Sequence, residues 1–174
     1  RFTLGATTRE IIVLEFSSAV MALILSGKVG SNIASEIGTM RITEQIDALD
    51  VMGVNSANYL ILPKICAMVL FMPILVIFSI ACGLIGAGLV AYFTGNPSID
   101  TYIYGIQAFF EPGNIFYAIK KSYVFAFLIA SIPSFWGYYV KGGALQVGRA
   151  STKAVVTTSI MVLLSDVILT KLLL

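Results

Sequence analysis

The chain has 174 residues, of which 58% are hydrophobic and 11% are charged, and its net charge is +2. A soluble domain is about a quarter charged, so the composition excludes an ordinary water-facing surface and indicates an all-α polytopic membrane protein. The small net charge, without a basic cluster interleaved with aromatic residues, argues against nucleic acid as a partner. The chain has no histidine, which excludes His-based acid–base chemistry and His-metal sites, and neither a metal site nor a cofactor is expected in this chain.

Long apolar runs predict about four transmembrane helices, since about 20 residues are needed to cross a bilayer. The predicted spans are residues 8–26, 65–93, 122–140 and 154–174. Pro63 suits the first turn of a helix, whereas Pro73 and Pro133 lie inside runs and predict kinks.

The connections between the spans carry turn and interface signals. Residues 94–121 are expected to form a loop with a turn at Gly95-Asn96-Pro97 and a short interfacial helix around Asp100–Phe110, capped by Ser98 or Asp100. The distribution of Lys and Arg places residues 27–64 and 141–153 in the cytoplasm, with Lys120 and Lys121 assigned to the opposite side.

Two carboxylates fall within or beside apolar runs. Glu15 is interpreted either as the mark of an interfacial helix end or as an intramembrane group that faces the bundle interior or a lipid-accessible cavity. For Asp166, a position facing the bundle and a position near the interface are equally compatible with the sequence.

The polar stretch 27–64 contains a short amphipathic helix. Ile42, Ile46 and Leu49 share one helical face, Thr43 or Thr39 is the expected N-cap, and Gly53 is the expected stop. Seven or eight residues are too few for a stable isolated helix, so this helix needs a surface to pack on. A lipid surface favours basic residues on the polar face, and the face here is mainly acidic, which favours a protein partner.

Small residues recur at helical spacing in two places and predict close helix packing. They are Gly27, Gly30 and Gly38 before the short helix, and Ser79, Gly83 and Ala87 in the second apolar run. The sequence is compatible with a packing partner within the chain and with one across a dimer.

The polar stretch resembles the signature of the MlaE family, the permease subunits of ABC transporters that move phospholipids between membranes. The resemblance rests on Gly27-Lys28-Val29-Gly30-Ser31, Glu36-Ile37-Gly38-Thr39-Met40, Thr43-Glu44-Gln45-Ile46-Asp47-Ala48-Leu49 and Met52-Gly53-Val54. The run Gly148-Arg149-Ala150-Ser151-Thr152-Lys153 and Asp166 resemble the last loop and helix of that family, and Glu15 matches a glutamate of its Arg-Glu-x-Gly-Pro element. Leu14 and Ser17-Ser18 depart from that element, which puts a charge pair between Glu15 and its neighbour in doubt.

The resemblance implies a homodimeric permease of the bacterial inner membrane with no catalytic residue of its own. A coupling helix is implied to contact a separate ATPase subunit, which binds ATP and Mg, through Arg41, Thr43, Glu44, Gln45, Ile46, Asp47 and Leu49. Glu15 is implied to line the lipid path, and a periplasmic MCE-domain lipid-binding protein is the further partner. The chain starts at Arg1, and the resemblance implies that an interfacial helix and a first transmembrane helix precede it.

Two alternatives come from other classes of protein. An ion-coupled secondary carrier would use Glu15 and Asp166, although carriers usually show internal repeats and broken helices, and no repeat is evident. An intramembrane enzyme is disfavoured because the chain lacks histidine and paired aspartates in facing spans.

Overall fold

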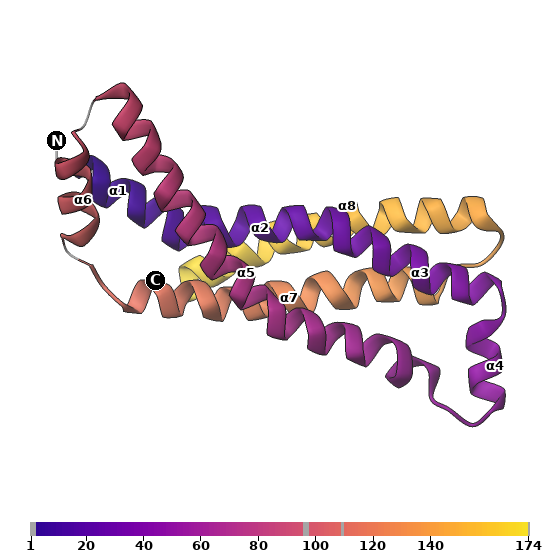
Figure 1. Ribbon diagram of the computed structural model, residues 1–174. Coiled ribbons are helices and arrows are strands. Elements are labelled where there is room, and N and C mark those ends of the chain that lie inside the picture. The colour runs from indigo at the N-terminus through magenta and orange to yellow at the C-terminus, as the bar shows by residue number, and fades with distance from the viewer. Residues whose placement is uncertain (1–2, 96–97, 109, 174) are drawn as a thin grey trace.

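The computed structural model describes residues 3–95, 98–108 and 110–173, and its regular elements there are all helices (Figure 1). Four of the helices in these residues are long and apolar enough to cross a membrane. The all-α polytopic prediction is therefore confirmed. Asn96 and Pro97, in the predicted turn, and Phe109, in the predicted interfacial helix, lie outside the described residues.

The first long helix runs without interruption from Thr3 to Ile42. It consists of α1 (Thr3–Ile11), the π-helical segment η1 (Ile12–Phe16), α2 (Ser17–Leu25), a second π-helical segment η2 (Ser26–Gly30) and α3 (Ser31–Ile42). At 1.5 Å per residue it is about 60 Å long, roughly twice the thickness of the hydrocarbon core. Residues 27–42 were expected to belong to a loop but are helical. The side chains of Ile33, Ala34 and Ile37 are buried there, so this part of the helix packs against the bundle.

The connection between the first two long helices consists of residues 43–55, and not of the whole predicted loop 27–64. It holds the short helix α4 (Gln45–Val51), and the second long helix α5 already begins at Ser56 and continues to Thr94. Asn55 caps α5, because its side chain accepts a hydrogen bond from the backbone N–H of Asn58 at 3.1 Å. Pro63 consequently lies inside α5 together with Pro73, and its assignment to a first helical turn was wrong.

The remaining helices are α6 (Ile99–Gln107), α7 (Gly113–Tyr138) and α8 (Ala144–Leu173). Ser98 is the N-cap residue of α6, which confirms one of the two predicted positions, although its side chain makes no capping hydrogen bond. Because α7 starts at Gly113, Lys120 and Lys121 belong to this helix and not to a loop.

Helix α7 forms the centre of the bundle and packs against α2, α3, α5 and α8 (Figure 1). Its buried face carries mostly small side chains one turn apart, which allow close helix approach; they are Ala118, Ser122, Ala126, Ala130 and Ser134. Phe125 and Ile129 fill the space between them and are fully buried. The core is thus built around α7, while many large apolar side chains of α5 and α8 are exposed, as a lipid-facing surface requires.

The small residues predicted to pack do so mainly within the chain. A Cβ atom at Gly83 would lie 3.0 Å from Ile12 Cγ2, one at Gly30 would lie 3.2 Å from Pro133 Cγ, and one at Gly38 would lie 3.1 Å from Val147 Cγ1. Ser79 and Ala87 are half-buried on the same side of α5 as Gly83. Gly27 differs, because a Cβ atom there would meet nothing within 4 Å.

The two ends of the bundle differ in the elements they carry. Helix α4 and the connection between α7 and α8 lie at one end, and both termini and α6 lie at the other (Figure 1). The segments predicted to be cytoplasmic therefore share one end.

Candidate functional site

The first candidate site is the end of the bundle that carries α4. Ile46 is fully buried against Ile33 and Ile37 of α3, and Leu60, Ile61 and Tyr138 pack against the same cluster. Ile46 therefore anchors α4 to its own membrane domain and does not offer a side chain to a partner, which corrects its expected role as a contact residue.

The start of α4 differs from the predicted capping. The Oγ1 atoms of Thr39 and Thr43 donate backwards to the carbonyl oxygens of Ser35 and Thr39, both at 2.8 Å, within and just after α3. The N-cap residue is Glu44, which has left-handed backbone angles (φ 60°, ψ 13°) and makes no side-chain capping hydrogen bond. Left-handed backbone costs a non-glycine residue roughly 1–2 kcal/mol, so the sharp turn between α3 and α4 is held by the packing around it.

The end of α4 confirms the predicted stop. Gly53 has φ 79°, and its N–H donates to the carbonyl of Asp50 at 3.1 Å, while the N–H of Val54 donates to the carbonyl of Leu49 at 3.1 Å. This paired arrangement ends helices at a glycine because only glycine adopts positive φ without a steric cost.

Polar contacts fix α4 relative to the long helices. Arg41 Nη1 lies 2.9 Å from Asp47 Oδ1, and its guanidinium lies 5.6 Å from the ring centroid of Tyr138. Asp50 Oδ1 accepts a hydrogen bond from the Ser56 N–H at 3.3 Å. Two expected contact residues, Arg41 and Asp47, thus bind each other, and these contacts tie α4 to the ends of α3 and α5.

The outward side of α4 carries an unexpected apolar tip. Val51 and Met52 are 89% and 68% exposed, and Gln45, Asp47 and Ala48 of α4 are exposed as well. The expected contact Leu49 is half-buried. The signal in the sequence was the position of Val51 and Met52 directly before the helix stop at Gly53. This exposed apolar pair, beside the exposed carboxylates of Asp47 and Asp50, is a candidate surface for docking a protein.

The second candidate site is a charged cluster inside the bundle. Lys121 of α7 is completely buried, and its Nζ lies 2.7 Å from Glu15 Oε2 and 2.6 Å from Asp166 Oδ1. Glu15 lies in η1, and π-helical turns are frequent at functional sites. Both carboxylates predicted as candidates therefore meet at one lysine, and Asp166 faces the bundle.

Hydroxyl groups complete the cluster. Thr170 Oγ1 donates to Glu15 Oε1 at 2.9 Å and accepts from Lys121 Nζ at 3.2 Å, and the Tyr117 OH lies 3.2 Å from Thr170 Oγ1. Because two carboxylates share one ammonium group, the three side chains together carry one excess negative charge in their ordinary ionisation states. The Glu15 side chain is 41% exposed, while Lys121 is 0% exposed, so the cluster opens to the outside of the bundle on the Glu15 side.

Lys121 is the residue that sequence reasoning missed. Helical spacing gave a signal, since Tyr117, Ser122 and Phe125 flank it on the buried face, but the start of α7 was placed one residue after Lys121. Charge pairing between η1, α7 and α8 through Glu15, Lys121 and Asp166 thus takes the place of the pairing within the first helix that Leu14 had put in doubt.

The described residues form a bundle with four helices long and apolar enough to cross a membrane, a short crosswise helix at one end (Figure 1) and a buried charged cluster. The chain belongs to the MlaE permease family, because the model of the family described as "Permease MlaE" matches residues 1–172.

Relatives agree with this assignment. The chain is 38% identical to a probable ABC transporter permease protein of Rickettsia bellii over 176 residues, which cover 99% of this chain and 68% of the relative. It is 36% identical to a probable ABC transporter permease protein of Synechocystis over 94% of this chain and 62% of the relative. It is also 32% identical to the chloroplastic protein TRIGALACTOSYLDIACYLGLYCEROL 1 of Arabidopsis thaliana over 89% of this chain and 44% of that protein.

The chain is accordingly an ABC transporter permease, a multi-pass membrane subunit of a kind that is typically non-catalytic. A permease of this class implies an ATPase partner. The ion-coupled carrier that would use Glu15 and Asp166 is set aside, because an ABC transporter takes its energy from ATP.

Proposed function

We propose that this chain is the permease subunit of an ABC transporter that moves phospholipids between bacterial membranes. The observation that supports the proposal best is α4, which is anchored through buried Ile46 and presents exposed Val51 and Met52 away from the bundle. The Arabidopsis relative carries the name of a diacylglycerol-based lipid, which is consistent with a lipid as the transported substrate.

The geometry suggests how a docked ATPase moves the permease. A force on α4 passes through Ile46 into α3 and the start of α5, and the ion pair between Arg41 and Asp47 resists rotation of α4 about its axis. Because the helix from Thr3 to Ile42 is continuous, it carries a tilt from the docking end to the charged cluster as a rigid body. Closing of the ATPase thereby changes the exposure of Glu15.

Glu15 is proposed to line the lipid path. Its carboxylate is held by Lys121 and Thr170 while its side chain remains partly exposed, so it presents a polar group on an otherwise apolar surface. The Glu15 carboxylate is proposed to interact with a phospholipid headgroup that enters the transmembrane part of the bundle. Lipid transport requires the headgroup to make this entry.

The proposal includes the assembly that the family resemblance implies. The permease works as a homodimer, with an MCE-domain lipid-binding protein on the periplasmic side and the ATPase on the side of α4. The membrane is the bacterial inner membrane. ATP and Mg bind the partner ATPase and not this chain.

The double substitution Val51→Asp with Met52→Asp tests the docking site. We expect it to reduce ATPase co-purification at least tenfold, because two charges would replace the apolar tip that the partner must cover. The matched control is Ile103→Asp, which changes a 47% exposed apolar residue of α6 at the opposite end. Full ATPase retention by the double variant, with normal membrane insertion of both proteins, would refute α4 as the docking element.

The lipid path is tested separately with Glu15→Ala. The assembled complex is expected to retain its ATPase subunit and to lose most lipid transfer between donor and acceptor vesicles, because a polar group on the path is gone. Transfer at the wild-type rate by a fully assembled Glu15→Ala complex would remove Glu15 from the lipid path.

A further inference from the structure

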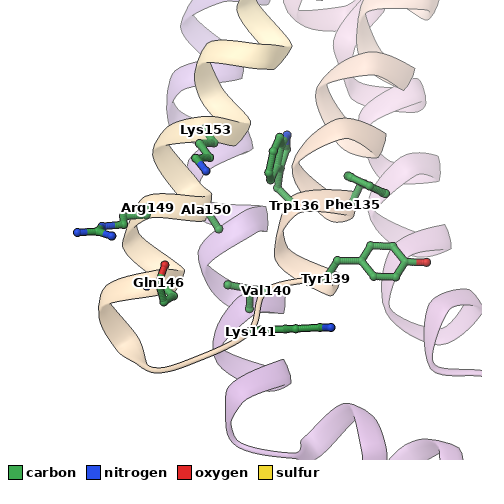
Figure 2. A pocket seen from close by; sticks show the side chains of 9 residues that line it. All are labelled: Phe135, Trp136, Tyr139, Val140, Lys141, Gln146, Arg149, Ala150 and Lys153. Carbon is green, nitrogen blue, oxygen red and sulfur yellow. The ribbon is translucent and has the colours of Figure 1, made fainter.

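A small cavity lies between α7 and α8 at the end of the bundle that also carries α4. It has a volume of about 180 Å³ and lies between the last turns of α7, the loop after it and the first turns of α8 (Figure 2). The charged cluster around Lys121 does not contribute to it.

One wall of the cavity is aromatic and its floor is apolar. Phe135, Trp136 and Tyr139 line it from α7, with Phe135 57% and Tyr139 64% exposed. Val140 and Ala150 form the floor and are buried in the cluster that holds Ile42. Aromatic residues at the end of an apolar helix mark the membrane–water interface, so the cavity lies at headgroup depth.

Three cations border the same cavity. Lys153 extends toward Trp136 from α8, with its Nζ 5.7 Å from a ring centroid of Trp136, as Figure 2 shows. Lys141 lies on the connecting loop, and Arg149 lies on α8 with its guanidinium pointing outward in Figure 2. Residues 141–153 contain no carboxylate, and the ion pairs in the described part of the chain involve other cations, namely Arg9, Arg41, Lys64 and Lys121.

We propose that this cavity binds the headgroup of an anionic phospholipid from the surrounding leaflet. The phosphate would take the place beside Lys153, and the acyl chains would lie along exposed Phe135. Basic side chains next to an apolar surface at the interface attract anionic lipids, and each contributes about a fivefold change in affinity. Helix α8 begins at Ala144, three residues after Lys141, and adds the positive end of its dipole.

A lipid fits this site better than a protein partner does. Helix α4, the proposed docking element, packs on α3 and α5, whereas the cavity lies between α7 and α8. A lipid supplies the anionic group and the apolar chain together, which matches the two kinds of wall. The site is independent of the proposed transport function, because a lipid bound here anchors this end of the bundle whether or not it is carried.

Trp136 provides a local probe, since it is the one tryptophan of the 174 residues. The full-length permease with its partners is titrated in mixed micelles with phosphatidylglycerol or phosphatidylcholine that carries brominated acyl chains, and bromine quenches nearby indole fluorescence. The fluorescence of Trp136 is obtained as the difference between the wild-type complex and the Trp136→Phe complex. We expect half-maximal quenching at a several-fold lower mole fraction of phosphatidylglycerol than of phosphatidylcholine.

The variants decide whether the charges cause this preference. Lys153→Gln should weaken the response to phosphatidylglycerol roughly fivefold, Lys153→Arg should preserve it, and the triple change of Lys141, Arg149 and Lys153 to Gln should abolish the preference. Lys120→Gln, at an exposed position near the other end of α7, is the matched control and should change nothing.

Four results would overturn the proposal. They are equal quenching by both lipids, an effect of Lys120→Gln as large as that of Lys153→Gln, displacement of phosphatidylglycerol by millimolar inorganic phosphate, and a preference that is seen only after the ATPase is removed. Displacement by phosphate would identify a free anion as the ligand, and the last result would identify the surface as part of the docking interface.

Discussion

At the scale of single residues, Lys120 and Lys121 show how helical geometry assigns neighbouring charges to opposite environments. Consecutive residues of a helix point about 100° apart, so Lys120 is exposed while Lys121 lies in the bundle between Glu15 and Asp166. A buried ammonium group is tolerated only when it is paired and hydrogen-bonded. The cost of burying Lys121 is therefore offset by groups from α7, α8 and the first long helix.

Replacement of Lys121 by Met should destabilise the permease by up to about 3–5 kcal/mol, because it leaves Asp166 and the partly exposed Glu15 without their cation. Thermal unfolding of the purified protein in detergent measures the loss, and Lys120→Met is the matched control with little expected effect. Combining Lys121→Met with Glu15→Gln and Asp166→Asn should restore most of the stability. If Lys121→Met and Lys120→Met unfold at the same temperature, the cluster does not stabilise the bundle.

At the scale of elements, the contact between α3 and α7 depends on a glycine. A Cβ atom at Gly137 would lie 2.7 Å from the carbonyl oxygen of Ala34 and 3.1 Å from Ile37 Cβ. Backbone cannot move aside as a flexible side chain can, so a larger residue must separate the two helices. Ile37 belongs to the same hydrophobic cluster as Ile46 of α4. The packing of α4 on α3 therefore depends on the close approach of α3 and α7.

Gly137→Ala is expected to destabilise the bundle by about 1–3 kcal/mol through overpacking. Gly148→Ala is the control, because Gly148 lies in α8 with nothing within 4 Å of its would-be Cβ atom, and alanine there should be neutral or stabilise by about 0.5–1 kcal/mol. Hydrogen exchange of Gln45–Val51 should rise in Gly137→Ala and stay unchanged in Gly148→Ala. Equal exchange in the two variants would show that the packing of α4 does not depend on the contact at Gly137.

At the scale of the whole molecule, the bundle has two unlike ends. One end carries α4, the exposed tip of Val51 and Met52, and the cations of the α7–α8 connection. The other carries α6, which Arg9 holds through hydrogen bonds from Nη1 to the carbonyl oxygens of Ile106 and Ala108 at 2.7 and 2.8 Å. The excess of Lys and Arg predicts that the first end faces the cytoplasm.

Site-directed labelling tests this orientation. In a background with Cys66 and Cys82 changed to Ser, a cysteine at Asp47 or Lys141 should react with a membrane-impermeant maleimide only when the cytoplasmic side is accessible. A cysteine at Asp100, an exposed residue of α6, should react from the opposite side. Labelling of Asp47→Cys and Asp100→Cys from the same side would refute the topology.

Periodicity and local chemistry predicted several features well. Four long apolar helices, the short amphipathic helix, its stop at Gly53 and the N-cap at Ser98 were each visible from nearby residues. Helix ends were less predictable, because residues 27–42 are too polar to resemble a span and are helical only because Ile33, Ala34 and Ile37 are buried against other helices. The predicted capping at Thr39 and Thr43 was wrong because Thr39 lies within α3 and Thr43 is the residue that ends it, while Glu44 is the N-cap residue of α4.

The sequence by itself determined the class of protein, because composition and the lengths of apolar runs leave a membrane bundle as the stable arrangement, and the polar signature indicated the family. Only the tertiary structure decided which groups meet. It paired Glu15 and Asp166 with Lys121 across 106 and 45 positions of the chain, turned Ile46 inward, and left Val51 and Met52 exposed. These outcomes depend on how several helices pack against α7, and the spacing of residues along one helix carries no information about the groups that a neighbouring helix will present.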